Sequence, residues 1–139
     1  MEQKAQQEPR YFIANFGEKY AHTHPVDGGC YPVPSCYEAP QVISEGDMML
    51  LCCWAGHKGL SRGDAWGIGK VTRKKRQGEE IAIYYEPESL PNPIKRAHID
   101  LCLTEKERRK FKMGAIYKAC WLFEIRTASF QCIVKGNKG

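Results

Sequence analysis

The most constraining feature of this chain is the run MMLLCCW, from Met48 to Trp54, in which every residue is apolar. A strand that alternates apolar and polar residues has one face on the core and one in water. An uninterrupted apolar run is instead typical of a strand that is covered on both faces. The run therefore predicts a closed or covered sheet, and other parts of the chain must supply the cover.

Further strands are indicated by short runs rich in β-branched and aromatic residues. They are YFIANF, WGIGKVTR, IAIYY, CWLFEI and SFQCIV, which occupy residues 11–16, 66–73, 81–85, 120–125 and 129–134. In WGIGKVTR, Gly67 and Gly69 share one face, which is typical of a bulge or of a close approach by another backbone or a ligand. The last two runs are predicted to form a strand pair around the turn RTAS.

Two proline-rich segments are predicted to be loops. Residues 17–40 hold four prolines and three glycines, and a loop of this length is expected to be organised or functional. EPESLPNPI, residues 86–94, has three prolines, so it is predicted to be an extended crossing loop and not a central strand. AHIDLCL, residues 97–103, is either a strand or an irregular apolar segment.

One clear helix is predicted after these segments. Thr104 and Glu107 form a T-x-x-E capping box, which supplies acceptors for the amides at a helix start. The helix spans about Glu105 to Met113 and stops at Gly114. The order of elements predicts an α+β fold, a small mixed and mostly antiparallel β-barrel with one or two packed helices.

Length and composition indicate one ordinary globular domain. The chain has 139 residues, of which 42% are apolar and 27% charged. A single domain is expected over residues 10–135, with a disordered tail over residues 1–9 and a short C-terminal tail over residues 136–139. No window approaches 18 apolar residues, and the polar start MEQKAQQEPR has no apolar signal core. Neither a membrane span nor secretion is therefore expected.

The seven cysteines are an odd number in a chain without a signal peptide, which argues against a disulfide framework. Cys52, Cys53, Cys120 and Cys132 lie in apolar strand-like runs, where a free cysteine behaves as a small hydrophobe. A reducing, cytoplasmic setting is expected for such a chain.

Two of the three tryptophans, Trp54 and Trp66, flank one basic loop. A planar base stacks on aromatic rings, and each stacked base contributes about 1–3 kcal/mol. The two indoles are therefore candidate walls of a ligand pocket. The alternative is that one or both belong to the core, which is the expectation for Trp121. Further ligand-binding candidates on the loop and the neighbouring strands are Tyr11, Asn15, His57, Lys58, Arg62 and Tyr85.

The chain resembles the PUA-like β-barrels, among which the EVE and ASCH domains, with the related YTH domains, are most similar. The resemblance rests on Gly46–Asp47 before an apolar strand, on the G-I-G-x-V motif at Gly67–Val71 and on the late WLFEI. It covers most of residues 11–134. It implies a barrel with one or two helices and a cleft for nucleic acid, often carrying a modified base. By position, Asn15, Trp54 and His57 would line that cleft.

Basic residues form two clusters in a chain whose formal net charge is +5. Such clusters can follow the phosphates of a nucleic acid, and the alternative is a solvated surface. The predicted phosphate contacts are Lys70, Arg73, Lys74, Lys75 and Arg76 in the first cluster and Arg108, Arg109 and Lys110 in the second.

A zinc site is an alternative organiser of the long loop. HTHPVDGGCYPVPSC places His22, His24, Cys30 and Cys36 within fifteen residues, and four nitrogen and sulfur ligands can hold a tetrahedral zinc ion. The spacing differs from the close pairs of zinc fingers and ribbons, so a loop with satisfied histidines and buried thiols is the other interpretation.

The leading functional hypothesis is a non-catalytic module that binds RNA or DNA, with an aromatic-walled pocket and a basic rim. The chain has no G-x-S-x-G motif, no P-loop and no H-E-x-x-H motif, so no catalytic residue is predicted. Two alternatives remain open. One is a small ASCH-like hydrolase of modified nucleosides, and the other is an interaction protein with a zinc-organised loop.

Overall fold

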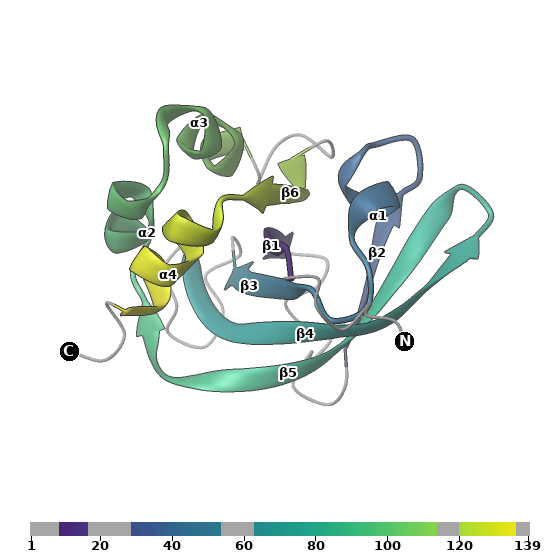
Figure 1. The fold of residues 1–139 in the computed structure, drawn as a ribbon, viewed down its shortest axis with the longest axis horizontal. Coiled ribbons are helices and arrows are strands. Elements are labelled where there is room, and N and C mark those ends of the chain that lie inside the picture. Colours follow the sequence, from purple (N-terminus) through teal and green to yellow (C-terminus); the bar gives the residue numbers. More distant parts are fainter. Residues whose placement is uncertain (1–8, 17–28, 54–62, 114–119, 136–139) are drawn as a thin grey trace, which may run out of the picture.

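A computed structural model describes residues 9–16, 29–53, 63–113 and 120–135 of the chain. The described residues form six strands and four helices (Figure 1). The strands are β1 (Tyr11–Phe16), β2 (Gly29–Pro34), β3 (Met48–Cys53), β4 (Asp64–Gln77), β5 (Glu80–Ile94) and β6 (Leu122–Ile125). The helices are α1 (Ala39–Val42), α2 (Arg96–Cys102), α3 (Glu105–Met113) and α4 (Thr127–Lys135).

All six strands belong to one mixed sheet with the order β2-β5-β4-β3-β1-β6. Strands β1 and β3 are parallel, and the other four neighbouring pairs are antiparallel. The long strands β4 and β5 bend, so the sheet curls into a half-barrel (Figure 1). The predicted α+β class and the mixed, mostly antiparallel sheet are thus confirmed.

The curl brings the two edges of the sheet together at one point. Tyr31 of β2, which is fully buried, shares its hydroxyl proton between the carbonyl oxygens of Asn15 (2.6 Å) and Trp121 (2.8 Å). Asn15 lies on β1 and Trp121 directly precedes β6, at the opposite edge of the sheet from β2. The hydroxyl therefore closes the half-barrel where no strand pairing does. Helix α1 also contacts β6, across the same gap.

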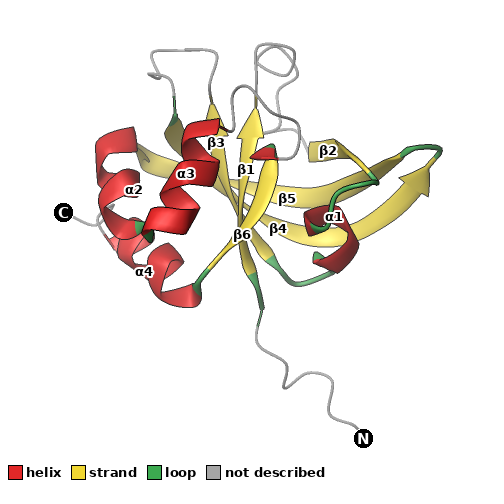
Figure 2. Ribbon diagram, turned by 90° about the horizontal axis from the view of Figure 1, so that it is seen from above, coloured by secondary structure: helices red, strands yellow, loops and turns green. Residues whose placement is uncertain are grey.

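The sheet has a buried cluster on each face. The interior cluster lies inside the curl and includes Met49 and Leu51 of β3. The helix-side cluster lies under α2, α3 and α4, which gather on one side of the sheet (Figure 2), and includes Leu50 and Cys52. Alternate residues of MMLLCCW thus enter opposite clusters, and each buried leucine contributes roughly 1.5–3 kcal/mol. The prediction that this strand is covered on both faces is confirmed.

The prediction that residues 86–94 form a crossing loop is wrong, because β5 continues through all three prolines to Ile94. The pairing of β2 with β5 ends where Gly29 faces Tyr85. Beyond Tyr85, β5 pairs with β4 alone among the described strands, and Pro87 faces Gly69 there. A strand with one edge unpaired tolerates prolines, since their missing N–H groups are not needed on that side.

Residues 17–40 were predicted to form a loop, and the described part of this segment contains β2 and α1 instead. Pro32 and Pro34 lie within β2, where they face Ala82 and Glu80 of β5. Strand β2 is at the edge of the sheet, which is the position that accepts proline. The prolines therefore mark an edge strand and not the absence of a strand.

Two further segments are helices where strands were predicted. SFQCIV belongs to α4, and AHIDLCL, expected to be a strand or irregular, is mostly in α2. Phe130 and Ile133 of α4 are buried three residues apart, as are Ile99 and Cys102 of α2. This spacing places each pair on one helix face, against the helix-side cluster. The fold therefore has four helices among its described residues, not one or two.

The expectation that Cys132 is a free cysteine in a strand-like run is also corrected. Cys102 of α2 and Cys132 of α4 are bridged, with their Cα atoms 5.6 Å apart. The error follows from the strand predicted at residues 129–134, because only the helix turns Cys132 toward α2. Cys52 is a buried free thiol, as predicted. None of the helices in the described part of the chain has the length and apolar character needed to cross a membrane.

Candidate functional site

The predicted ligand-binding residues that the structure describes meet in part at one end of the sheet. Asn15 faces Cys52 on β3, and Cys52 faces Ala65 on β4, directly before Trp66. The backbone N–H of Asn15 donates to the carbonyl oxygen of Trp121 at 2.7 Å. Asn15, Trp66 and Trp121 therefore lie along adjacent strand ends, which are spaced about 4.8 Å apart. We call these three residues the sheet end.

Asn15 is held in place at the sheet end. Its side chain is almost completely buried, and its Nδ2 donates to the carbonyl oxygen of Cys120 at 2.9 Å. Its carbonyl oxygen accepts the Tyr31 hydroxyl, as described above. One hydrogen bond thus fixes the side-chain amide and two more fix the Asn15 backbone, so Asn15 ties the end of β1 to the segment before β6.

Trp66 and Trp121 are half-buried and pack against the interior cluster. Trp66 occupies a bulge of β4, where the pairing with β5 shifts between Ala65 and Gly67. A bulge re-aims the side chain it carries. Each indole thus supports the core and also keeps part of its surface accessible. For Trp66 the pocket and core interpretations are compatible, and Trp121, expected in the core, is only partly buried.

Other predicted pocket residues lie elsewhere. Tyr11 stacks on Phe130 of α4, with ring centroids 4.3 Å apart, on the helix side of the sheet. Tyr85 is buried in the interior cluster, and burial together with the nearby Cys30 raises the pKa of its phenol. Neither tyrosine is brought next to Trp66 on an exposed surface. The remaining candidates, Trp54, His57, Lys58 and Arg62, lie outside the described residues.

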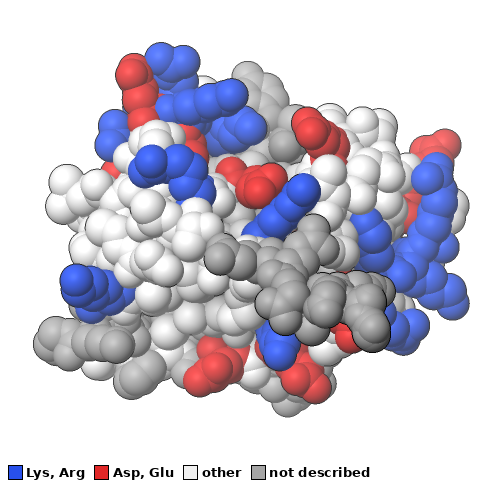
Figure 3. All heavy atoms as spheres, viewed as in Figure 1, with Lys and Arg blue, Asp and Glu red and all other residues white. Residues whose placement is uncertain are grey.

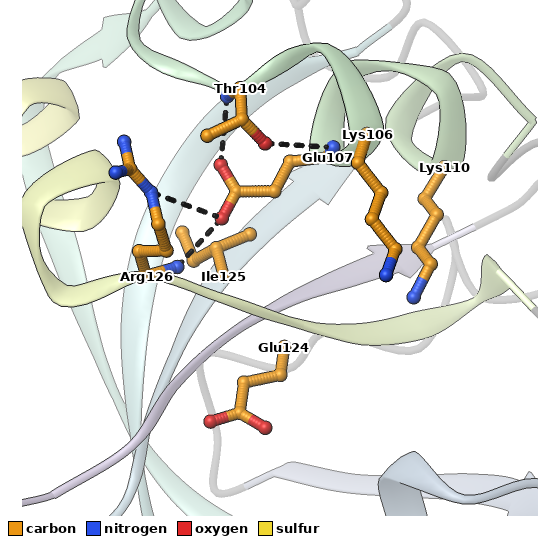
Figure 4. A pocket seen from close by; sticks show the side chains of 7 residues that line it. All are labelled: Thr104, Lys106, Glu107, Lys110, Glu124, Ile125 and Arg126. Carbon is orange, nitrogen blue, oxygen red and sulfur yellow. Dashed lines mark hydrogen bonds and ion pairs between the residues drawn. The ribbon is translucent and has the colours of Figure 1, made fainter.

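A polar cleft of about 380 Å³ opens between α3, β6 and the start of α4 (Figure 4). We call it the α3 cleft. Lys106 and Lys110 are one helical turn apart on α3, and their side chains point together into the cleft. Arg126 lines the other side, beside α4. The other lining residues are Thr104, Glu107, Glu124 and Ile125.

Glu107 lines the α3 cleft, and its carboxylate is already used within the fold. Oε1 accepts the Thr104 N–H (2.9 Å) and the Ser129 hydroxyl (2.7 Å), while Oε2 accepts the Arg126 N–H (2.7 Å). The Glu107 N–H in turn donates to Thr104 Oγ1, so the predicted capping box is confirmed. Burial alone would raise the pKa of Glu107, but these hydrogen bonds and the Arg126 charge lower it overall. One carboxylate thus fastens the starts of both α3 and α4.

The charges left over in the cleft are mainly positive. Glu124 lies 4.0 Å from the Arg10 guanidinium, which offsets part of its charge. No ion pair of Lys106 or Lys110 occurs among the described residues. Burial raises the pKa of the Cys120 thiol, and the nearby Lys110 ammonium opposes that rise. Cys120, whose carbonyl oxygen accepts from the Asn15 side chain, thus lies within the electrostatic reach of Lys110.

Sequence reasoning gave Lys110 a phosphate contact but missed Lys106 and chose Arg108 and Arg109 for the rest of the helix. Arg108 donates to the carbonyl oxygens of Asp100 (3.1 Å) and Leu103 (3.0 Å), so it caps the end of α2. Arg109 pairs with Glu105 on the exposed side of α3 at 2.9 Å. The signal for Lys106 was the spacing of four residues from Lys110.

The first basic cluster of the sequence lies on β4 near its turn into β5. Blue side chains gather over this hairpin and, separately, over α3 (Figure 3). Arg73 lies over the Tyr84 ring at 4.1 Å, a cation–π contact. Lys74 donates to the carbonyl oxygens of Pro40 (3.0 Å) and Gln41 (2.8 Å), and burial lowers its pKa. Lys70, Lys75 and Arg76 are exposed.

The structure describes half of the predicted zinc ligands. Cys30 and Cys36 are both exposed, and an extended segment that pairs with β5 as far as Ser35 separates them. His22 and His24 lie outside the described residues. No cluster of three or more His, Cys, Asp or Glu side chains suited to a metal ion occurs in the described ranges. The zinc site stays a prediction.

Comparison with known proteins adds no family to these observations. No protein-family model matches the chain, and a search of curated proteins finds no match either.

Proposed function

We propose that this protein is a PUA-like module that binds RNA or DNA. Phosphates occupy the α3 cleft, and an unpaired base, in some ligands a modified one, lies against the sheet end. The observation that carries the proposal is the pair of ammonium groups of Lys106 and Lys110, which point into one cleft. Of the two carboxylates in that cleft, Glu107 is already hydrogen-bonded and Glu124 is partly offset by Arg10.

Two physical arguments support this assignment. Cations that face a cleft attract phosphates and release counterions when they bind, which makes the affinity depend strongly on salt. An accessible indole face accepts any base. The α3 cleft supplies the first kind of contact, and the partly exposed indoles of Trp66 and Trp121 supply the second. Cys120, which accepts from Asn15 at the sheet end, lies within the electrostatic reach of Lys110 in the cleft.

The first test is the binding of short fluorescent single-stranded RNA and DNA, measured by anisotropy between about 50 and 200 mM salt. The variant is the double substitution Lys106→Gln with Lys110→Gln. Each phosphate contact on a single strand contributes about 0.7 to the slope of log affinity against log salt. The double variant is therefore expected to weaken binding and to lower that slope by about 1.4.

A matched control removes the same charge elsewhere. Lys112 on α3 and Lys135 on α4 are exposed and do not line the cleft. The double substitution Lys112→Gln with Lys135→Gln should keep most of the affinity and the slope. Equal losses in both double variants would show a general charge effect, and no binding at 50 mM salt by the unaltered protein would refute the proposal.

The sheet end has its own test. Trp66→Ala and Trp121→Ala should each weaken binding by about 1–3 kcal/mol if a base stacks there, with a salt slope that does not change. Thermal unfolding of the same variants shows whether the fold survives. A stable variant that binds as tightly as the unaltered protein would show that no base stacks at the sheet end. Oligonucleotides with and without a modified base then show whether the pocket prefers modification.

A further inference from the structure

The bridged cysteines lie next to a histidine, away from the α3 cleft. His98 and Cys102 are four residues apart on α2, so they share one helix face. The Nε2 atom of His98 lies 3.7 Å from Cys102 Sγ and 3.2 Å from the carbonyl oxygen of Cys132. A carbonyl oxygen only accepts, so the short contact requires a proton on Nε2. That proton is held at the edge of the disulfide.

The two sulfur-bearing residues differ in accessibility. Cys132 is exposed on α4, whereas Cys102 is 8% exposed and belongs to the helix-side cluster. Thiol–disulfide exchange begins with a thiolate that attacks one sulfur and expels the other. Access favours attack on Cys132, so Cys102 is the sulfur that leaves. The Nε2 atom of His98, which contacts the Cys132 carbonyl oxygen, lies 3.7 Å from the leaving sulfur.

We propose that Cys102, Cys132 and His98 form a thiol–disulfide exchange site that reacts with small thiols while the protein is folded. In the first step a thiolate attacks Cys132 Sγ and forms a mixed disulfide, and the electron pair of the broken S–S bond passes to Cys102 Sγ. In its imidazolium form His98 donates the Nε2 proton to that sulfur, becomes a neutral imidazole and regains a proton from water. A second thiolate then attacks the mixed disulfide, so two thiols become one external disulfide and the protein gains two thiols.

The position of the bridge defines what its opening changes. The bridge ties α2 to the C-terminal half of α4. The N-terminal end of α4 is held separately, by the Glu107 contacts to Arg126 and Ser129. Reduction therefore removes the covalent link between α2 and the C-terminal half of α4. The Glu107 hydrogen bonds at the α3 cleft do not depend on that link. The inference is independent of the proposed nucleic-acid binding, because its readouts are the state of the bridge and the protection of α4.

The test uses the full-length folded protein, purified without reductant and treated with glutathione. Acid-quenched samples are alkylated and analysed by peptide mass spectrometry. We expect a Cys102–Cys132 bridge at the start and a mixed disulfide on Cys132 during the reaction. Hydrogen exchange should rise in residues 131–135 after full reduction with dithiothreitol and stay unchanged in α3. A mixed disulfide mainly on Cys102 would overturn the assigned direction of attack.

The role of His98 is tested with His98→Gln, which keeps an N–H donor for the Cys132 carbonyl but cannot transfer a proton. Opening by dithiothreitol should slow by roughly tenfold, which is less than the typical contribution of a positioned proton donor because thiolates already leave well. The thermal midpoint of the oxidised variant should stay near that of the unaltered protein. If the bridge opens only at the rate of global unfolding, in both proteins alike, the site does not exist. If the His98→Gln variant folds poorly, the position of the mixed disulfide in the unaltered protein still tests whether the exchange site reacts as proposed.

Discussion

Glu107 offers the sharpest prediction about stability, because one carboxylate serves two helix starts. The change is Glu107→Gln, which keeps the size of the side chain and replaces one acceptor oxygen by a donor. Thr104 and Ser129 donate to one oxygen and Arg126 to the other. The side-chain amide of glutamine has one acceptor oxygen. If that oxygen accepts from Thr104 and Ser129, the amide NH2 group faces the Arg126 N–H, which then has lost its acceptor.

The magnitude follows from these contacts. A buried donor that loses its partner costs about 1–3 kcal/mol. The lost negative charge also removes a favourable interaction of about 0.3–1 kcal/mol with each of the two helix starts. The substitution should therefore lower the free energy of unfolding by roughly 2–4 kcal/mol at pH 7, measured by urea titration. Glu107→Ala, which leaves all the donors without this acceptor, should cost more.

The pH dependence supplies an independent check. The folded-state pKa of Glu107 is lowered overall, so its ionised form stabilises the fold above the unfolded-state pKa, about 4.3 for a glutamate. That contribution is lost as the pH falls from there through the folded-state pKa. The stability gap between the unaltered protein and the glutamine variant should be constant near neutrality and narrow below about pH 4.3.

A neighbouring glutamate provides the control. Glu105 is on the same helix turn and pairs with Arg109, but both side chains are about three-quarters exposed. Glu105→Gln should change the stability by less than about 1 kcal/mol, as is usual for exposed pairs. Equal urea midpoints for the two glutamine variants, or a gap that persists unchanged at acidic pH, would refute the assigned role of Glu107.

Two further predictions concern the interior of the half-barrel. Tyr31→Phe removes the hydroxyl that joins the sheet edges and should lower the free energy of unfolding by about 1–2 kcal/mol. Tyr85→Phe should leave the free energy of unfolding unchanged or raise it, because the buried Tyr85 hydroxyl has no hydrogen-bond partner among the described residues. Urea titration of both variants checks the opposite signs, and a larger loss for Tyr85 would contradict them. Gly69→Ala should destabilise by about 1–3 kcal/mol, because a Cβ there would lie 2.7 Å from the Tyr85 ring; a thermal midpoint equal to that of the unaltered protein would be the contrary result.

Features whose physical cause is local were predictable from the sequence. The capping box needs only Thr104 and Glu107 at a spacing of three, and the double-faced strand needs only an unbroken apolar run. Strand β5 was mispredicted because proline excludes a strand only where both edges pair, and that depends on β2 ending opposite Tyr85. Helix α4 was mispredicted because a short apolar run satisfies both periods, and the surface that selects the helix belongs to α2.

The same distinction explains why the α3 cleft was only partly predicted. Neighbouring residues on a helix are rotated by about 100°, so fixing one side chain places all the others. Phe111 and Glu107 are four residues apart and lie on the same buried face of α3. The burial of Glu107 depends on the start of α4, about twenty residues later in the chain, so the local sequence does not reveal it. With Glu107 inward, Lys106 and Lys110 flank it on one side and Arg108 turns to the other, toward the end of α2. Which cations of a basic helix face a cleft therefore depends on the buried face of that helix, and a charge count alone cannot choose among the five cations of α3.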